Sequence, residues 1–458
     1  MNNEAYSYAA HKRLLNRERR AEPFPRSAFI KSTLPQLDKT GHGVSVRAEA
    51  VRRMSSQVHW DYKNESLKIQ DKEDYQIVVI PSSHRTPKKH NSSPVDVTNE
   101  VADILRKETI GKYPVAIYKE SDFADDLEKR KMLDRQKVPE TTYIIASPIT
   151  ERDYLLIQTT ASRLKKRGVK KIVIIAPFLG FAREDKDGIL DKDGRVIDTG
   201  QMLTLRAALQ GLRGLVDFIY TFEPHSSATQ AWAAESGIQL APISLWKFMI
   251  GQIIEKEKIN RKNLISMGPD IGRNIATKKI ADYFNVPVIG LNKHRDPKTR
   301  RIWFDKLSKE QRKILLGKDR KGSKDLILYD DEGASLGTSK DVIEELITKY
   351  KPKSIRLILA HQRFTDSFVD YKGVYHDGWK KNLNRILELA QQHNVELKIY
   401  LSNSREPIGD MEEFGERINQ HLINIVPYIF QQIANDVQGI NPIKKPNNEK
   451  EDVILQSE

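Results

Sequence analysis

The chain has 458 residues, a formal net charge of +14 and no cysteine. Without cysteine it can form no disulfide, no thiolate metal site and no cysteine nucleophile, while 39% hydrophobic residues suffice for the cores of two or three domains. No stretch reaches the roughly 18 apolar residues of a membrane span, and the N-terminus lacks the apolar segment of a signal peptide, so we expect a cytoplasmic protein without membrane contact.

The two ends of the chain differ from its middle. Residues 1–70 hold nearly half of the excess positive charge and have no regular pattern, which predicts a basic N-terminal extension. Residues 406–458 predict a helical C-terminal extension followed by a flexible tail. The positive charge favours anions, which include nucleic acid, acidic lipid and phosphorylated metabolites, and charge alone does not choose among these.

Short apolar or β-branched runs recur from about residue 75 onwards. Most are continuously hydrophobic, which is typical of strands buried on both faces of a parallel sheet. The runs lie at 75–80, 142–147, 171–177, 217–222, 264–268, 286–291, 325–331, 354–360 and 397–402.

Segments of helical length separate these runs, for example 151–167, 339–350 and 377–393. Alternating strands and helices predict an α/β fold, and the pattern divides into two similar domains, 71–243 and 244–405, joined by a helix near 241–254. Ligands of such sheets bind beyond the carboxyl ends of the strands, so the residues that follow each run are the candidates for function.

Two loops of the first predicted domain carry charged groups. After 171–177 come Arg183, Asp185 and Lys186, whose cationic members could grip the phosphates of a nucleotide or form a solvated charge run. After 217–222 come Glu223 and His225, which could share a metal ion or its water shell, although a histidine at a strand end is often structural.

The second predicted domain contributes two further segments. Asp270 precedes a helix, where a carboxylate can hold Mg²⁺ or simply cap the helix. Lys293 and Arg295 lie two residues apart in an extended segment, so they could converge on one anion or form a basic surface turn.

The segment at 330–339 is the most informative one. The carboxylates of Asp330 and Asp331 can hold sugar hydroxyls or a hydrated metal ion, and Gly337 allows a tight turn. Backbone N–H groups of that turn, together with Ser335 and Thr338, favour a phosphate. The alternative is an ordinary corner in which Thr338 caps the following helix.

In this order, the motifs resemble those of the ribose-phosphate pyrophosphokinase family over roughly residues 75–405. The matching segments are IPSSH at 80–84, PFLGFAREDK at 177–186, FEPHSSATQ at 222–230, GPDIG at 268–272, NKHR at 292–295 and DDEGASLGTS at 330–339. The resemblance implies two phosphoribosyltransferase-type, Rossmann-like domains with mainly parallel sheets, with ATP and Mg²⁺ bound between them.

The resemblance also implies a role for each site residue. The predicted catalytic residues are Lys293 and Arg295. The predicted ATP-binding residues are Arg183, Asp185, Lys186 and His225, and the predicted metal ligands are Asp270, His225 and Glu223. The predicted ligands of the acceptor's ribose and phosphate are Asp330, Asp331, Ser335, Gly337 and Thr338.

The implied reaction moves the β,γ-diphosphate of ATP to the C1 hydroxyl of ribose 5-phosphate, in a homo-oligomer that is a dimer or a hexamer. The chain departs from the family near the acceptor and metal sites. Ala334 stands where the family usually has a third aspartate, Arg273 replaces a glycine, and the segments after Lys186 and Arg295 are enlarged. These changes leave open a larger acceptor that contains ribose 5-phosphate, such as ADP-ribose.

Three other functions remain open. A non-catalytic relative could regulate an active enzyme, although packing alone does not require the combination of Lys293, Arg295, Asp270 and His225. A phosphoribosyltransferase would share the sugar loop but would not need the ATP loop. No zinc spacing, helix-turn-helix or aromatic RNA-binding motif is present, so nucleic acid is not the expected main partner.

Overall fold

The structure is a computed structural model of the chain. The residues that it describes are 58–61, 66–69, 75–80, 98, 101, 115–121, 129–132, 139–184, 188–190, 196–198, 202–268, 274–291, 293–295, 302–316, 324–369, 375–405 and 421–437. Most of the predicted N-terminal extension and the predicted tail lie outside them, and so do Asp185, Lys186 and Asp270. Within 58–69, strands β1 (Val58–Asp61) and β2 (Ser66–Ile69) pair antiparallel.

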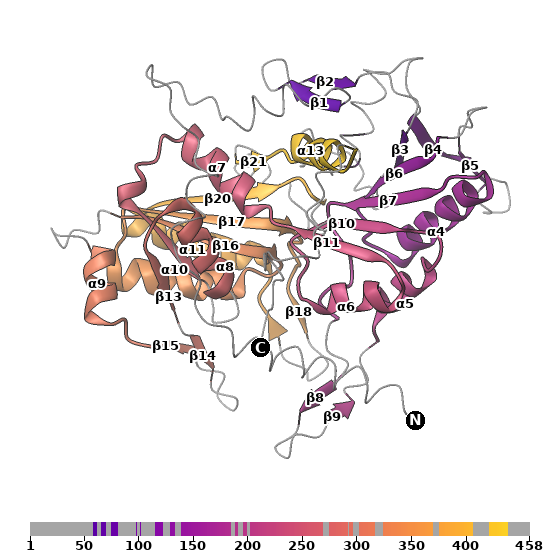
Figure 1. The fold of residues 1–458 in the computed structure, drawn as a ribbon. Helices are drawn as coiled ribbons and strands as arrows, with labels where there is room; N and C mark the ends of the chain where they lie inside the picture. Colours follow the sequence, from indigo (N-terminus) through magenta and orange to yellow (C-terminus); the bar gives the residue numbers. More distant parts are fainter. Residues whose placement is uncertain are drawn as a thin grey trace, which may run out of the picture. The chain divides into compact units, whose positions relative to one another are not determined.

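The first sheet has seven strands in the order β11-β10-β7-β6-β3-β4-β5, and its pairs are parallel except for β4 with β5 (Figure 1). Its strands are β3 (Tyr75–Ile80), β4 (Val115–Ser121), β5 (Lys129–Met132), β6 (Thr141–Ala146), β7 (Lys171–Ala176), β10 (Phe218–Phe222) and β11 (Gln239–Ile243). Four predicted apolar runs are confirmed as β3, β6, β7 and β10. All five residues of β10 are buried, as expected of a strand with both faces covered.

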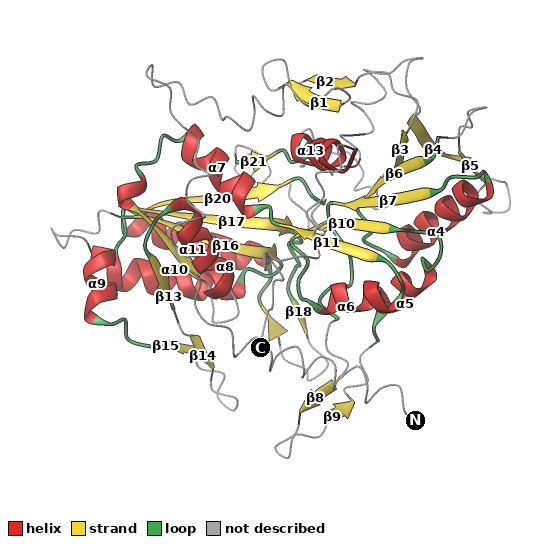
Figure 2. Cartoon of the chain, in the orientation of Figure 1, coloured by secondary structure: helices red, strands yellow, loops and turns green. Residues whose placement is uncertain are grey.

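One face of this sheet is covered by helices α4 (Glu151–Lys166), α5 (Thr204–Gly211) and α6 (Ala228–Glu235), whose apolar side chains form one core with alternate residues of the strands (Figure 2). Helix α4 starts where predicted, because Thr150 and Asp153 make a capping box. Thr150 Oγ1 accepts the Asp153 N–H at 3.3 Å, and Asp153 Oδ2 accepts the Thr150 N–H at 2.8 Å.

The second sheet has six parallel strands in the order β13-β12-β16-β17-β20-β21. Its strands are β12 (Leu264–Gly268), β13 (Val288–Gly290), β16 (Asp325–Gly333), β17 (Ser354–Gln362), β20 (Glu396–Ser402) and β21 (Leu422–Ile423). The five remaining apolar runs are thus confirmed as strands.

Helices α10 (Gly337–Tyr350) and α11 (Trp379–Gln392) pack on one face of the second sheet. The apolar side chains of Val342, Ile343, Leu346 and Ile347 on α10 are buried in that core. The described residues also contain helices α8 (Asn274–Phe284) and α9 (Lys309–Leu316), a 3₁₀ turn (Arg261–Asn263) and three short antiparallel pairs. The pairs are β8 (Gly188–Leu190) with β9 (Val196–Asp198), β14 (Lys293–Arg295) with β15 (Ile302–Phe304), and β18 (Phe368–Val369) with β19 (Tyr375–His376).

Two helices contribute to a core that contains residues of both sheets. Helix α7 (Trp246–Lys256) connects the sheets along the chain, and helix α13 (Val426–Val437) follows the last strand of the second sheet. Their apolar side chains belong to one buried cluster with β3, β6, β7 and β10 of the first sheet and with β16, β17 and β20 of the second. The predicted C-terminal helical extension therefore completes the fold.

The carboxylate of Asp436 joins α13 to the first sheet. Its Oδ2 accepts a hydrogen bond from Tyr143 Oη at 2.7 Å and lies 2.9 Å from Lys171 Nζ, and its Oδ1 accepts from Tyr220 Oη at 2.8 Å. Burial alone would raise the pKa of Asp436, but the hydrogen bonds from Lys171, Tyr143 and Tyr220 lower it, so the carboxylate stays ionised in its buried position.

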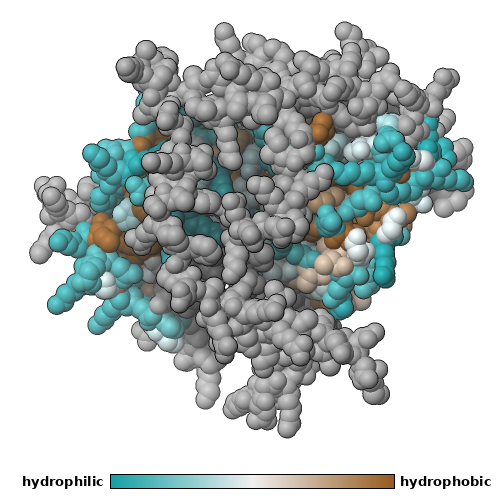
Figure 3. All heavy atoms as spheres, viewed as in Figure 1, coloured by the Kyte–Doolittle hydropathy of each residue, from teal (hydrophilic) through white to brown (hydrophobic). Residues whose placement is uncertain are grey.

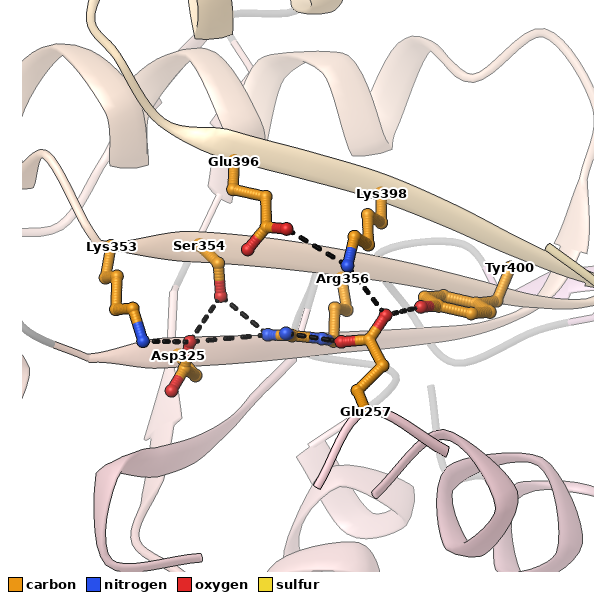
Figure 4. Close-up of polar contacts among 8 residues, drawn as sticks. All are labelled: Glu257, Asp325, Lys353, Ser354, Arg356, Glu396, Lys398 and Tyr400. Atoms are coloured by element: carbon orange, nitrogen blue, oxygen red, sulfur yellow. Dashed lines mark hydrogen bonds and ion pairs between the residues drawn. The ribbon is translucent and has the colours of Figure 1, made fainter. Parts of the chain in front are cut away.

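A second charged network joins α7 to the amino ends of β16, β17 and β20 (Figure 4). Glu257, at the end of α7, contacts Arg356 Nε at 2.6 Å and Lys398 Nζ at 2.9 Å, and it accepts a hydrogen bond from Tyr400. Arg356 also donates to Ser354 Oγ at 2.6 Å. Burial alone would raise the pKa of Glu257, but its three donors lower it to about 2.

The surface of the described residues is mostly hydrophilic on the face shown in Figure 3, with hydrophobic residues in separate patches. Exposed large hydrophobic side chains include Leu155 on α4 and Met202 before α5. Among the helices of the described ranges, none combines the length and the apolar character that a membrane crossing requires.

Candidate functional site

The candidate site is built from loops at the carboxyl ends of strands in both sheets. Strands β7 and β10 of the first sheet lead to the loops that carry Arg183 and His225. Strand β16 of the second sheet carries three acidic residues near its carboxyl end, Asp330, Asp331 and Glu332, and leads to the turn before α10. The sequence predicts this edge for ligand binding, and the contacts below connect its parts.

His225 and Asp331, 106 residues apart in the sequence, lie within hydrogen-bond distance of each other. His225 Nδ1 lies 2.7 Å from Asp331 Oδ2, and because an ionised carboxylate only accepts, Nδ1 carries the proton. The side chain of Asp331 is 4% exposed, whereas that of His225 is 29% exposed. A predicted ATP residue of the first sheet thus meets a predicted acceptor residue of the second.

Arg183 connects the loop after β7 to the next residue of β16. Its Nη1 lies 4.0 Å from Glu332 Oε1, and the same oxygen lies 3.3 Å from Nη1 of Arg363, the residue that follows β17. The loop reaches this place by a close approach at Gly180, whose N–H donates to Pro148 O at 2.8 Å. A Cβ at Gly180 would lie 2.9 Å from the carbonyl oxygens of both Pro148 and Ile149, so the position requires glycine.

Glu223 has a structural contact in this state of the protein. It adopts a left-handed backbone conformation with φ of 41°, and its Oε1 accepts the Leu245 N–H at 2.7 Å, just before α7 begins. A carboxylate at a helix N-terminus offsets the positive end of the helix dipole. The role of Glu223 as a metal ligand stays a prediction.

The turn between β16 and α10 is held from two sides. The N–H groups of Arg363 and Phe364 both donate to Gly333 O at 2.9 Å, and Asn382 Nδ2 donates to Ser335 O at 2.8 Å. Leu336 has a left-handed conformation with φ of 60° and directly precedes α10.

Helix α10 therefore begins at Gly337, with Leu336 as its N-cap and without a side-chain cap hydrogen bond. The alternative interpretation, in which Thr338 caps the helix, is wrong because Thr338 lies inside the first turn. Gly337 N–H instead donates to Ser335 Oγ at 3.4 Å, a weak contact that a bound anion could replace.

Lys293 and Arg295 are the first and last residues of β14. The strand pairs with β15, with Lys293 opposite Phe304 and Arg295 opposite Ile302. The backbone is thus extended, as the sequence predicts for this segment. The convergence of the two side chains on one anion stays a prediction.

The sequence analysis missed the residues that follow β17 and β20. His361 is fully buried: its Nε2 donates to Phe222 O at 3.0 Å, and its Nδ1 accepts from Ser404 Oγ at 2.8 Å. Burial lowers the pKa of His361, although Glu332 and Asp331 act in the opposite direction, so the ring is neutral. His361 thereby fixes the end of β10, where Phe222 is followed closely by Pro224 and His225.

A usable signal for these residues was present. HQR follows the apolar run 354–360, and NSR follows the run 397–402, so the rule that placed the other candidates also applies here. Arg405, from the second of these segments, lies with its guanidinium carbon 4.6 Å from the ring centroid of Phe178, which follows β7. These contacts again join the two sheets at their carboxyl ends.

The described residues contain no group of three or more His, Asp or Glu side chains arranged to hold a metal ion. Mg²⁺ prefers carboxylate oxygens and substrate phosphates to imidazole nitrogen, and it needs only one or two protein carboxylates. Of the predicted ligands, Asp270 therefore fits best by its chemistry, because Glu223 already accepts a helix N–H and His225 bonds Asp331.

Comparisons with known proteins bear on the family. No family model matches the chain. A ribose-phosphate pyrophosphokinase from Saccharolobus solfataricus is 27% identical over 208 residues, which are 42% of this chain and 63% of the relative's length. The crystal structure of a phosphoribosylpyrophosphate synthetase from Mycobacterium smegmatis matches with a TM-score of 0.54 at 17% identity, over 80% of this chain and 99% of that one.

The structural match shows that the two-sheet fold is shared. The fold class predicted from the sequence, two α/β domains with mainly parallel sheets, is confirmed. The chain is thus similar to ribose-phosphate pyrophosphokinases in the order of its strand-end motifs, in part of its sequence and in its two-sheet fold.

Proposed function

We propose that the chain transfers the β,γ-diphosphate of ATP to the C1 hydroxyl of ribose 5-phosphate, giving 5-phosphoribosyl 1-diphosphate and AMP. The hydroxyl oxygen attacks the β-phosphorus, the bond from that phosphorus to the bridging oxygen of AMP breaks, and the hydroxyl proton is released to solvent. Such transfers depend on in-line positioning and charge neutralisation more than on covalent help from the protein.

The observation that carries this proposal is the meeting of two loops of the first sheet with two adjacent carboxylates of β16. His225 bonds Asp331 at 2.7 Å, and Arg183 lies 4.0 Å from Glu332. For direct transfer, the segments that bind the nucleotide and those that bind the sugar must be no farther apart than the length of a diphosphate group. These contacts support that arrangement within a single chain.

Each group of residues has a proposed role. Lys293 and Arg295 would offset charge on the phosphoryl oxygens and on the departing AMP. Asp330 and Asp331 would orient the ribose hydroxyls, while the turn with Ser335, Gly337 and Thr338 would take the acceptor's phosphate. The proposed ATP-binding residues are Arg183, Asp185, Lys186 and His225.

Mg²⁺ bound with ATP would supply positive charge against the triphosphate, with Asp270 as the carboxylate that we expect to hold it. Once both substrates are bound, the protein has to align the C1 hydroxyl with the β-phosphorus. We assign this alignment to the loops described above. We also propose that the chain forms a homo-oligomer, a dimer or a hexamer. Light scattering would determine the mass of this assembly.

An acceptor screen tests the proposed function. The protein is incubated with ATP, Mg²⁺ and either ribose 5-phosphate, ADP-ribose or no acceptor, and AMP and product masses are measured. We expect AMP and a product heavier by one diphosphate only with ribose 5-phosphate. A product only with ADP-ribose would move the acceptor to the larger alternative, and no AMP with either would favour the non-catalytic alternative.

A further inference from the structure

Glu332 contacts two arginines that come from different parts of the chain. Its side chain is 7% exposed, and the single oxygen Oε1 faces Nη1 of Arg363 at 3.3 Å and Nη1 of Arg183 at 4.0 Å. The two arginine side chains are 38% and 48% exposed. A nearly buried carboxylate thus accepts a hydrogen bond from one guanidinium group and faces a second, and both groups remain partly open to solvent.

The position of Glu332 is fixed on both sides. It lies on β16 opposite His361 of β17, and the next residue, Gly333, lies opposite Gln362. A Cβ at Gly333 would come within 2.4 Å of Leu359 Cδ1, so the strand end packs tightly against β17. The backbone at Glu332 therefore has little conformational freedom, and its carboxylate in turn restricts the arginine side chains that it contacts.

The backbone of Arg363 is hydrogen-bonded to the turn that precedes α10. Its own N–H donates to Gly333 O at 2.9 Å, and the N–H of Thr365 donates to Ala334 O at 3.3 Å. The Nε atom of Arg363 is buried and makes no hydrogen bond with the described part of the chain. One edge of its guanidinium is therefore enclosed, while the side chain as a whole stays partly accessible.

One carboxylate cannot neutralise two guanidinium groups, so the Arg183–Glu332–Arg363 cluster keeps a net positive charge. Planar guanidinium groups bind phosphate through paired N–H donors, and a fixed orientation reduces the entropy lost on binding. The cluster adjoins the turn to which the acceptor's phosphate is assigned, and that assignment rests on the proposed function.

We propose that Arg363 binds the phosphate group of the acceptor and that Glu332 is a positioning residue that orients Arg363 toward this phosphate and Arg183 toward ATP. Glu332 then links the two substrate sites through one carboxylate. Arg363 determines specificity, because it favours acceptors that carry a phosphate on the ribose over those that do not.

Steady-state kinetics with separate substrate titrations test this inference. Arg363→Gln should raise KM for ribose 5-phosphate at least about tenfold, the effect of losing a charged hydrogen bond, and leave KM for ATP within about twofold. The same variant should reduce the preference for ribose 5-phosphate over ribose. Glu332→Gln should raise KM for both substrates at least about fivefold, and Glu332→Asp should restore part of the loss.

A matched control is Glu344→Gln, which removes the carboxylate from a pair with Arg385 at 2.9 Å between α10 and α11. It should change neither KM. If Arg363→Gln raises KM for ATP alone, or changes neither constant, the assignment of Arg363 is overturned. Arg363→Lys, which keeps the charge and loses the paired donors, serves the same test if the glutamine variant does not fold.

Calorimetric binding of ribose 5-phosphate to the wild type and to Arg363→Gln separates this inference from the proposed function. The wild type could release no AMP and still bind ribose 5-phosphate at least about tenfold more tightly than the variant. That result would support the phosphate site and contradict the proposed transfer reaction. Equal binding by both proteins overturns the phosphate site whatever the turnover.

Discussion

Asp331 and Glu332 are neighbours on β16, yet each meets a basic side chain from a different loop of the first sheet. The sequence could place His225, Arg183 and Asp331 at strand ends, because that follows from local pattern. It could not pair them, because pairing across 106 residues depends on how two separate cores pack.

Lys293 is the residue whose loss we expect to affect the chemical step most. Lys293→Ala should lower kcat by at least about a hundredfold, because a preorganised cation at a phosphoryl centre is worth roughly 3–5 kcal/mol. Acceptor-dependent AMP release measures kcat, and the melting temperature should not change. Lys309→Ala, at an exposed position at the start of α9, is the control. Near-normal turnover in Lys293→Ala would remove this residue from the mechanism.

At the level of elements, the loop after β7 is positioned by backbone contact. Gly180→Ala should displace this loop from the end of β6, because the added Cβ would lie 2.9 Å from two carbonyl oxygens. We expect KM for ATP to rise roughly tenfold, with a loss of stability of about 1–3 kcal/mol. Kinetics and urea unfolding measure the two effects. Gly251→Ala on α7, where a Cβ would meet nothing within 4 Å, should show neither.

The network around Glu257 makes the attachment of α7 sensitive to acid. The pKa of Glu257 in the folded protein is about 2, below its ordinary value of 4.5. Its contribution to stability is therefore complete above pH 4.5 and is lost as the pH falls from 4.5 toward 2. With solvent screening allowed for, the contribution is on the order of 1–2 kcal/mol.

Glu257→Gln should remove this part of the pH dependence. Urea unfolding at several pH values between 3 and 6 would show a shallower loss of stability in the variant than in the wild type. Glu255→Gln, at an exposed position on the same helix, should behave as the wild type does. Parallel curves for wild type and Glu257→Gln would contradict the assignment.

The nine apolar runs all became strands, including β13 at an edge of the second sheet, whereas strands such as β11 and β4 escaped prediction. Strand β11 contains Pro242 and overlaps a segment interpreted as a connecting helix. It lies at the edge of the first sheet, where a proline nitrogen that cannot donate is tolerated. Strand β4 ends in YKES, a polar sequence that lacks the apolar density of a central strand. Hydrophobicity therefore identifies continuously apolar strands and misses those that contain proline or polar residues.

For the whole molecule, the core that contains residues of both sheets predicts cooperative behaviour. Asp436→Asn should destabilise the protein by about 2 kcal/mol, because Tyr143, Tyr220 and Lys171 would lose a charged partner. Tyr143→Phe, which removes one of these donors, should cost about 1 kcal/mol. Urea unfolding measures both values. A cost in Asp436→Asn no larger than that in Tyr143→Phe would show that the carboxylate's charge adds nothing.

The return of α13 to the first sheet also orders events during synthesis of the chain. Tyr143 and Tyr220 leave the ribosome long before Asp436, since roughly 180 residues separate the end of β11 from the start of α13, or about 10–40 s of translation. Until those last residues arrive, the apolar cluster that Tyr143 and Tyr220 share with α13 is incomplete, and part of its aromatic surface stays exposed. A chaperone that recognises exposed aromatic surface would therefore meet this protein early in its production and release it only near the end.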